Sequence, residues 1–165
     1  MKKFALTLFF ALPLVMMGQE LKSGKKFTNT VVLENAPEAI WAAITDYSNF
    51  KFWDEGIVDV KCSGELKKRQ NCQVITSNGK IIEVEIVALV ENESYTLRYK
   101  LSSGNMYVQR HLTSDDQSAL SETVWYKGIS QKTFEKYKGE DYGGYLERRL
   151  SRFKDFMEGK SREGR

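Results

Sequence analysis

Residues 31–60 decide the fold and read VVLENAPEAIWAAITDYSNFKFWDEGIVDV. Residues 31–33 are apolar and rich in branched side chains, which favours a strand. Pro37 then occupies the first position of a predicted helix, and Glu38 lies in its first turn. The unpaired backbone amides of a first turn tolerate a proline and attract an acid. The stretch therefore begins with a strand that leads directly into a helix.

The helix in this stretch is short and has one apolar face. That face carries Ile40, Trp41 and Ile44. Residues 46–49 interrupt the helical pattern, residues 50–53 allow one more helical turn, and residues 57–60 resume a strand. The predicted order is strand, two short helices, strand, and we interpret Trp41 as core or hinge packing.

The middle of the chain reads as an antiparallel meander, because turn signals recur between short alternating runs. Residues 95–101 alternate, and their predicted inward face carries Tyr95, Leu97, Tyr99 and Leu101. The strand before it has a predicted inward row of Ile82, Val84, Ile86, Ala88 and Val90, with Glu83 and Glu85 outward. Each strand is expected to have one buried face and one solvated face.

Asn78 and Gly79 signal a hairpin, because both residue types tolerate positive φ. The length of the loop sets the pairing of the flanking strands. A two-residue turn pairs Ile75 with Ile82, whereas a three-residue loop pairs Val74 with Ile82.

The two cysteines of the chain lie on the two strands of the preceding hairpin, the second of which also enters the Asn78–Gly79 turn. If Cys62 faces Cys72, then Val60 faces Val74, and this register agrees only with the three-residue loop. Cross-strand cysteines are close enough to bond, and an oxidising compartment favours the bond. We hypothesise a Cys62–Cys72 disulfide; the alternative is two reduced cysteines packed as small apolar groups.

The next hairpin places a charged residue on the buried face. A turn at residues 102–105 pairs Leu101 with Met106, and this pairing points Arg110 inward. A buried guanidinium needs an anionic partner. A ligand carboxylate or phosphate would supply one, Glu122 on the adjacent strand is the internal alternative, and a shift of register would point Arg110 outward.

The last predicted strand is placed by its turn at residues 114–117. Pairing Thr113 with Ser118 puts three side chains on the same face as Arg110, namely Ser121, Thr123 and Trp125. The same register places His111 on the outer face. We therefore interpret His111 as a surface residue rather than as part of a catalytic triad.

Residues 131–157 change to helical spacing. One predicted stripe carries Leu146, Leu150, Phe153 and Met157, and the other faces carry Glu147, Arg148, Arg149 and Lys154. Gly143 and Gly144 interrupt the segment, and each glycine costs about 1 kcal/mol relative to alanine inside a helix. We expect a kink or a break between two helices at these glycines.

These features together resemble the START-like (SRPBCC) superfamily, in its polyketide cyclase/dehydrase and lipid-transport branch. Residues 36–50, APEAIWAAITDYSNF, and residues 53–58, WDEGIV, carry most of the resemblance, which extends over residues 27–157. The resemblance implies an α+β helix-grip fold, in which an antiparallel sheet curves around a long C-terminal helix and two short helices follow the first strand. It also implies a cavity between the sheet and that helix.

A small hydrophobic or amphipathic ligand, such as a lipid, an isoprenoid or an aromatic metabolite, is the partner that the resemblance implies. The residues we expect to line its cavity are Trp53, Tyr95, Tyr99, Arg110, Trp125 and Leu150. Plain core packing is the alternative for the aromatic members of this set. We rank a carrier first, a structural or partner-binding domain with a filled cavity second, and a cyclase/dehydrase-like enzyme third.

The N-terminus predicts export. Lys2 and Lys3 precede an uncharged apolar run that ends at Gly18. This pattern is typical of a secretory signal peptide, and the run is shorter than the ~20 residues that cross a bilayer. We expect a signal peptide over residues 1–18, a single domain over residues 19–165, a periplasmic or secreted location, and no membrane span after cleavage.

The charge and residue counts exclude several classes of function. The chain has 25 basic and 22 acidic residues, and loss of residues 1–18 removes two lysines and no acid. A nearly balanced charge argues against binding to a nucleic-acid backbone. One histidine and two cysteines leave too few ligands for a zinc site, and the common nucleotide-binding and hydrolase motifs are absent. We expect no metal and no cofactor.

Overall fold

The computed structural model of the protein describes residues 25–160, so the predicted signal peptide lies outside the described residues. The elements follow in the order β1 (Phe27–Leu33), α1 (Pro37–Thr45), η1 (Tyr47–Asn49), α2 (Phe50–Trp53), β2 (Ile57–Lys61), β3 (Asn71–Thr76), β4 (Ile81–Val90), β5 (Ser94–Leu101), β6 (Gly104–Thr113), β7 (Ser118–Lys127), α3 (Gln131–Lys138) and α4 (Tyr142–Met157).

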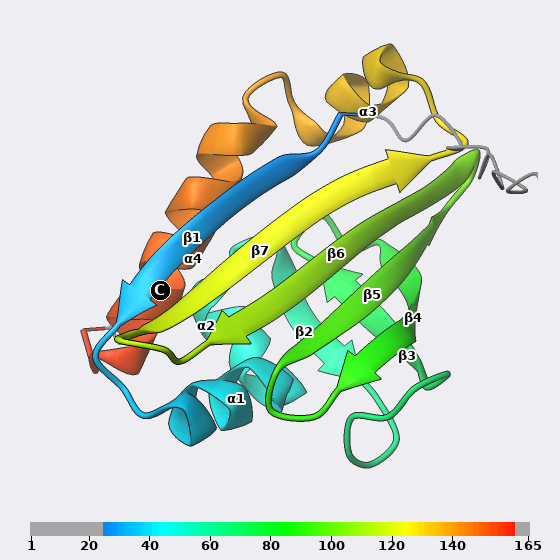
Figure 1. The fold of residues 1–165 in the computed structure, drawn as a ribbon. Coiled ribbons are helices and arrows are strands. Elements are labelled where there is room, and N and C mark those ends of the chain that lie inside the picture. Colours follow the sequence, from blue (N-terminus) through cyan, green and yellow to red (C-terminus); the bar gives the residue numbers. More distant parts are fainter. Residues whose placement is uncertain (1–24, 161–165) are drawn as a thin grey trace, which may run out of the picture.

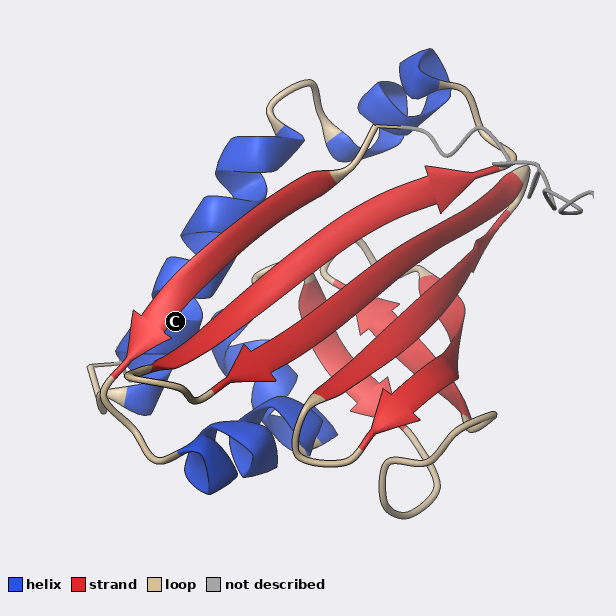
Figure 2. Ribbon diagram, in the orientation of Figure 1, coloured by secondary structure: helices blue, strands red, loops and turns tan. Residues whose placement is uncertain are grey.

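The seven strands form one antiparallel sheet in the order β1-β7-β6-β5-β4-β3-β2. The sheet is strongly curved, and α4 runs beside its edge strand β1 (Figure 1). The short helices α1 and α2 lie at one end of the curved sheet, and α3 lies at the opposite end (Figure 2). This arrangement confirms the predicted α+β helix-grip fold.

The stretch that decided the fold forms the predicted elements. Pro37 opens α1, and three side chains of that helix are buried, namely Ile40, Ala43 and Ile44. Asp46 ends α1 and begins η1, where its carboxylate accepts a hydrogen bond of 2.9 Å from the backbone N–H of Ser48. A capping side chain of this kind satisfies one of the donors that a helix leaves open at its N-terminus.

The β3–β4 hairpin adopts the three-residue alternative. Val74 pairs with Ile82, and Cys72 pairs with Val84. Cys62 and Cys72 are joined in a disulfide with their Cα atoms 4.5 Å apart. The covalent link therefore fixes the segment after β2 to the start of β3.

The predicted inward row of β4 is wrong in its second half. The register shifts between Ile86 and Ala88, which marks a bulge. An extra residue in one strand turns the side chains beyond it to the other face. As a result Ala88 and Val90 are exposed, while Leu89 packs against the core.

The hairpins between β5, β6 and β7 differ from the predicted registers. Leu101 pairs with Gly104 rather than with Met106, a two-residue change that keeps Arg110 on the inner face. At the next turn Thr113 pairs with Ala119 rather than with Ser118. This one-residue change reverses the faces of β7, so the prediction that Ser121, Thr123 and Trp125 face inward is wrong. The inner face instead carries Glu122, Val124 and Tyr126, all buried.

The C-terminal helical segment divides earlier than predicted. The helix α3 ends at Gly139, whose φ of +86° suits glycine. Gly143 and Gly144 lie in the first turn of α4, where Asp141 caps the backbone N–H of Gly144 at 3.1 Å. The buried residues of α4 are Tyr142, Leu146, Arg149, Leu150 and Phe153. Within residues 25–160, no helix combines the length and apolar character needed to span a membrane.

Candidate functional site

The space between the sheet and the helices is occupied at its centre by Arg110 of β6, which is only 1% exposed. Its Nε donates a 2.7 Å hydrogen bond to a carboxylate oxygen of Glu122, and its Nη1 donates one of 2.6 Å to the hydroxyl of Tyr95. The rings of Phe50 and Trp53 each lie 4.8 Å from the guanidinium carbon. Arg110 is thus enclosed by aromatic faces and a carboxylate.

A second buried arginine joins this centre from α4. Arg149 donates a 3.2 Å hydrogen bond to Asp54 and forms an ion pair with Glu122. The hydroxyl of Tyr145 donates to Asp54 at 2.9 Å. We call Arg110, Glu122, Arg149 and Asp54 the central cluster; its two arginines and two carboxylates balance in charge.

The partner of Arg110 is Glu122. The sequence had left two partners open, a ligand anion and Glu122, and the structure pairs Arg110 with the second. The pairing follows from the register, because Arg110 and Glu122 lie directly opposite each other on β6 and β7. Buried charges of opposite sign satisfy each other without a ligand. The central cluster therefore fills the middle of the sheet–helix interior with protein groups.

Most of the predicted lining residues belong to this packed interior. Trp53, Tyr95 and Leu150 are between 1% and 2% exposed, and Tyr99 is 7% exposed. Trp125 is the exception, because it lies on the outer face and stacks on Tyr107 with ring centroids 5.2 Å apart. The reversed register of β7 explains this error.

Tyr95 is the buried tyrosine that is hydrogen-bonded to Arg110, and its hydroxyl is a candidate for proton transfer in the interior. Its hydroxyl donates to the carbonyl oxygen of Ile44 at 2.6 Å and accepts from Arg110. Burial raises the pKa of Tyr95, against the opposing effect of the Arg110 charge. A hydroxyl that is fully bonded and harder to ionise is poorly suited to act as a base.

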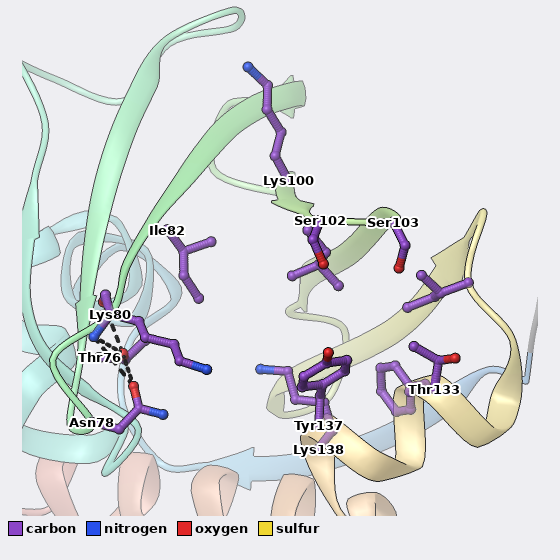
Figure 3. Close-up of a pocket in the computed structure, with 13 residues that line it drawn as sticks. Thr76, Asn78, Lys80, Ile82, Lys100, Ser102, Ser103, Thr133, Tyr137 and Lys138 are labelled. Carbon is purple, nitrogen blue, oxygen red and sulfur yellow. Dashed lines mark hydrogen bonds between the residues drawn. The ribbon is translucent and has the colours of Figure 1, made fainter.

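A pocket of about 350 Å³ opens at the end of the sheet where α3 lies (Figure 3). We call it the mouth pocket. It is lined by the β3–β4 hairpin, the β5–β6 turn, and α3 with the segment before it: Thr76, Asn78, Lys80, Ile82, Lys100, Leu101, Ser102, Ser103, Ile129, Thr133, Phe134, Tyr137 and Lys138.

Local sequence positions these walls. In the hairpin, the hydroxyl of Thr76 donates to the side-chain oxygen of Asn78 at 2.7 Å, and Gly79 takes a φ of +76°. At the start of α3, the Ser130 hydroxyl accepts a 3.2 Å hydrogen bond from the backbone N–H of Thr133. The turn and the cap hold the hairpin and α3 in defined positions.

The mouth pocket combines apolar and cationic side chains. Its apolar members are Ile82, Leu101, Ile129 and Phe134, and the ring of Phe134 stacks on Tyr126 with centroids 4.5 Å apart. The nitrogens of Lys80 and Lys138 point toward each other across the pocket (Figure 3). Burial lowers the pKa of Lys138, with the charge of Asp54 acting in the opposite direction. Such a surface suits a molecule with an apolar body and a polar end.

Solved structures with similar folds exist, although no family model and no curated protein matches the sequence. DynU16, a putative protein in the dynemicin biosynthetic locus, matches with a TM-score of 0.64 at 14% identity over 82% of this chain and 48% of its own. A norcoclaurine synthase point mutant from Thalictrum, in complex with a transition-state analogue, matches at 0.61, with 8% identity over 85% and 98%. The Aha1 dimer from Colwellia psychrerythraea matches at 0.59, with 18% identity over 86% and 100%.

The chain has the START-like helix-grip fold. It spans about half the length of DynU16. The TM-scores of 0.59 to 0.64 establish a shared fold, and at identities of 8% to 18% they establish the fold alone, so function must be argued from the site.

The sequence did not predict Asp54 in the centre, and the prediction that Arg149 lies on another face than the buried stripe of the C-terminal helix is wrong, because Arg149 is only 7% exposed. Arg149 had a detectable signal, since it follows Leu146 by three residues and precedes Phe153 by four, which places it on the buried stripe. Lys80 and Lys138 of the mouth pocket had no comparable signal, because they are 58 positions apart and meet only through the placement of α3.

Over residues 25–160, histidine, cysteine, aspartate and glutamate side chains form no group of three or more that could hold an ion. His111 lies on β6 with 44% of its side chain exposed, 3.8 Å from Glu93.

Proposed function

We propose that the protein is an exported carrier that binds a small hydrophobic or amphipathic molecule in the mouth pocket. The observation that carries this proposal is the pocket itself, about 350 Å³ with an apolar wall and a polar rim. Ligand pockets of proteins commonly range from about 300 to 1,000 Å³. The ligand would belong to the predicted classes, such as a lipid, an isoprenoid or an aromatic metabolite.

The proposed binding site differs from the cavity that the resemblance implied at the interface between the sheet and α4. That interface holds the central cluster, whose charges are paired within the protein. The mouth pocket instead lies between the sheet and α3. The norcoclaurine synthase structure, in complex with a transition-state analogue, supports a START-like fold as a host for small molecules.

Two features support export. Residues 1–18 have the pattern of a secretory signal peptide. Cys62 and Cys72 are joined in a disulfide, a bond that persists in oxidising compartments such as the periplasm or the extracellular space. Intact-mass measurement of protein recovered from outside the cytoplasm tests export, and we expect a mass that lacks residues 1–18.

Binding is tested with N-phenyl-1-naphthylamine, an uncharged probe whose fluorescence rises in apolar surroundings. We expect saturable binding to the purified protein. Thr133→Trp places a bulky ring in the pocket wall and should weaken binding at least about tenfold, because it fills the ligand volume. Ser151→Trp, at an exposed position of α4, is the matched control and should bind as the wild type does.

A structural domain with a filled cavity is the second candidate, and the central cluster favours it. Arg110 and Glu122, 1% and 0% exposed, occupy space that a ligand would otherwise use. Absence of saturable probe binding would select this candidate. Binding that Thr133→Trp leaves unchanged would place the ligand elsewhere and contradict the mouth pocket as its site.

A further inference from the structure

We propose that the ligand of the mouth pocket carries an anionic oxygen-bearing head group, held between Lys80 and Lys138. This inference rests on the proposed function and narrows it to one chemical class, single-chain or compact amphiphiles that end in a carboxylate or a phosphate. The two lysines come from opposite walls, the β3–β4 hairpin and the last turn of α3.

The geometry of the two lysines is the first support. Their side-chain nitrogens point toward each other across the pocket (Figure 3), with Lys80 at an exposed position and Lys138 half-buried. Two ammonium groups that converge repel each other, and an anion between them converts that repulsion into two attractive contacts. A converging pair of cations is therefore the arrangement expected around an anion.

The second support is the absence of acidic partners. Within the described part of the chain, neither Lys80 nor Lys138 forms a salt bridge. The pocket lining holds three lysines and no aspartate or glutamate. The third lysine, Lys100, is already paired with Glu83 at 3.1 Å. Two positive charges are left for a ligand.

The third support is the apolar surface beside the lysines. Lys138 is half-buried on the same helix as Phe134, which is 1% exposed. Ile82, Leu101 and Ile129 complete an apolar wall next to the charged rim. A hydrocarbon body fits against this wall while its head group reaches the ammonium groups. Ser102, Ser103 and Thr133 supply hydroxyl donors for further oxygen atoms of the head group.

The test is displacement of N-phenyl-1-naphthylamine by four ligands that share one decyl chain. Decanoate and decyl phosphate carry the proposed head groups, decanol is neutral and decylamine is cationic. We expect both anions to bind at least about tenfold more tightly than decanol, since a charge-assisted hydrogen bond contributes that much in affinity. Decylamine should bind most weakly. Comparing the two anions distinguishes a carboxylate from a phosphate.

Variants assign the preference to the two lysines. Lys80→Met and Lys138→Met keep the apolar stem and remove the charge, so each should reduce the preference for decanoate over decanol about tenfold, mainly by weakening decanoate binding. Lys132→Met, at an exposed position of the same helix α3, should change neither.

The outcomes separate the two proposals. If decanol and decanoate displace the probe equally, the anionic head group is refuted, and if both lysine variants keep the full preference for decanoate, its placement between Lys80 and Lys138 is refuted; in both cases the mouth pocket remains a binding site. If the probe does not bind and no decyl ligand is detected by calorimetry, both proposals fail.

Discussion

The central cluster contains two arginines, and the mouth pocket contains two lysines outside any salt bridge, Lys80 and Lys138; the two regions differ in what faces these cations. Arg110 and Arg149 each contact a buried carboxylate. Lys80 and Lys138 face each other over a pocket without an acidic lining residue. The fold itself pairs the charges of its interior, whereas Lys80 and Lys138 have no acidic partner among the described residues.

The two regions also differ in the elements that build them. The central cluster is held by β6, β7, α2 and α4, which are regular elements packed on the core. The mouth pocket is built mainly from turns, strand ends and the eight-residue helix α3. Arginine suits the first region because its planar guanidinium bonds several partners at once, whereas lysine presents a single flexible charge.

The largest effect should come from breaking the central cluster at Glu122. Glu122→Leu leaves two buried arginines with one carboxylate, and removing one partner from a buried ion pair typically costs about 3 to 5 kcal/mol. We expect a loss of this size in the free energy of unfolding, measured with urea. Glu83→Gln, which removes an exposed carboxylate on β4, should cost less than about 1 kcal/mol.

A second measurement sharpens the result for Glu122. Combining Arg110→Met with Glu122→Leu removes both members of the pair, so the double variant should lose less stability than the sum of the two single losses. A loss below about 1 kcal/mol for Glu122→Leu, or strict additivity in the double variant, would show that the cluster is not a coupled network.

The disulfide should have the next largest effect. Replacing both cysteines with alanine, Cys62→Ala and Cys72→Ala, frees a loop of about 10 residues in the unfolded chain, which costs about 2 to 3 kcal/mol. The mouth pocket is lined by other residues, so ligand affinity should stay within about twofold. Thermal unfolding and probe titration measure the two quantities. A variant that unfolds as the wild type does would contradict the structural role of the disulfide.

Replacing Tyr99 should have the smallest effect on the free energy of unfolding. Tyr99 lies on β5 between Tyr95 of the centre and Leu101 of the mouth. Burial raises the pKa of Tyr99 to about 12. The unfolded chain ionises first, near pH 10, so the neutral folded state loses stability as pH rises from there toward 12. At pH 11 the loss is about 1 kcal/mol.

Tyr99→Phe removes this alkaline sensitivity and leaves that of the other tyrosines. The difference between the variant and the wild type in free energy of unfolding should therefore change by about 1 kcal/mol from pH 9 to pH 11. Urea unfolding at both pH values measures it. A difference that is constant with pH would show that Tyr99 is not held neutral by its buried position.

Hydrophobic period predicted the strands and the helices because it is a local property, and the resemblance to START-like proteins predicted the helix-grip fold. The inner and outer faces of a strand were predicted less well wherever one extra residue in a turn or bulge decides which side chains point inward. The turn before β7 reversed Trp125, and the bulge in β4 reversed Ala88. Neither is encoded by the alternation of the strand itself.

The candidate site was predicted in part. Glu122 was one of the two partners predicted for Arg110, and the register of β6 and β7 places it directly opposite Arg110. The mouth pocket was not predicted, because it depends on where α3 ends and turns. The break falls at Gly139 rather than at Gly143, and α3 forms one wall of the pocket while the β3–β4 hairpin and the β5–β6 turn form others. Contacts between distant turns leave no periodic signal in a sequence.

The central claim is that ligand binds at the mouth and not at the centre. Two-dimensional NMR of the labelled protein during titration with decanoate tests it most directly, because each backbone amide reports its own surroundings. We predict shifts concentrated in residues 76–82, 100–103 and 129–138, which hold the walls of the mouth pocket. Shifts concentrated instead at Asp54, Arg110, Glu122 and Arg149, or no shifts at saturating decanoate, would contradict the claim.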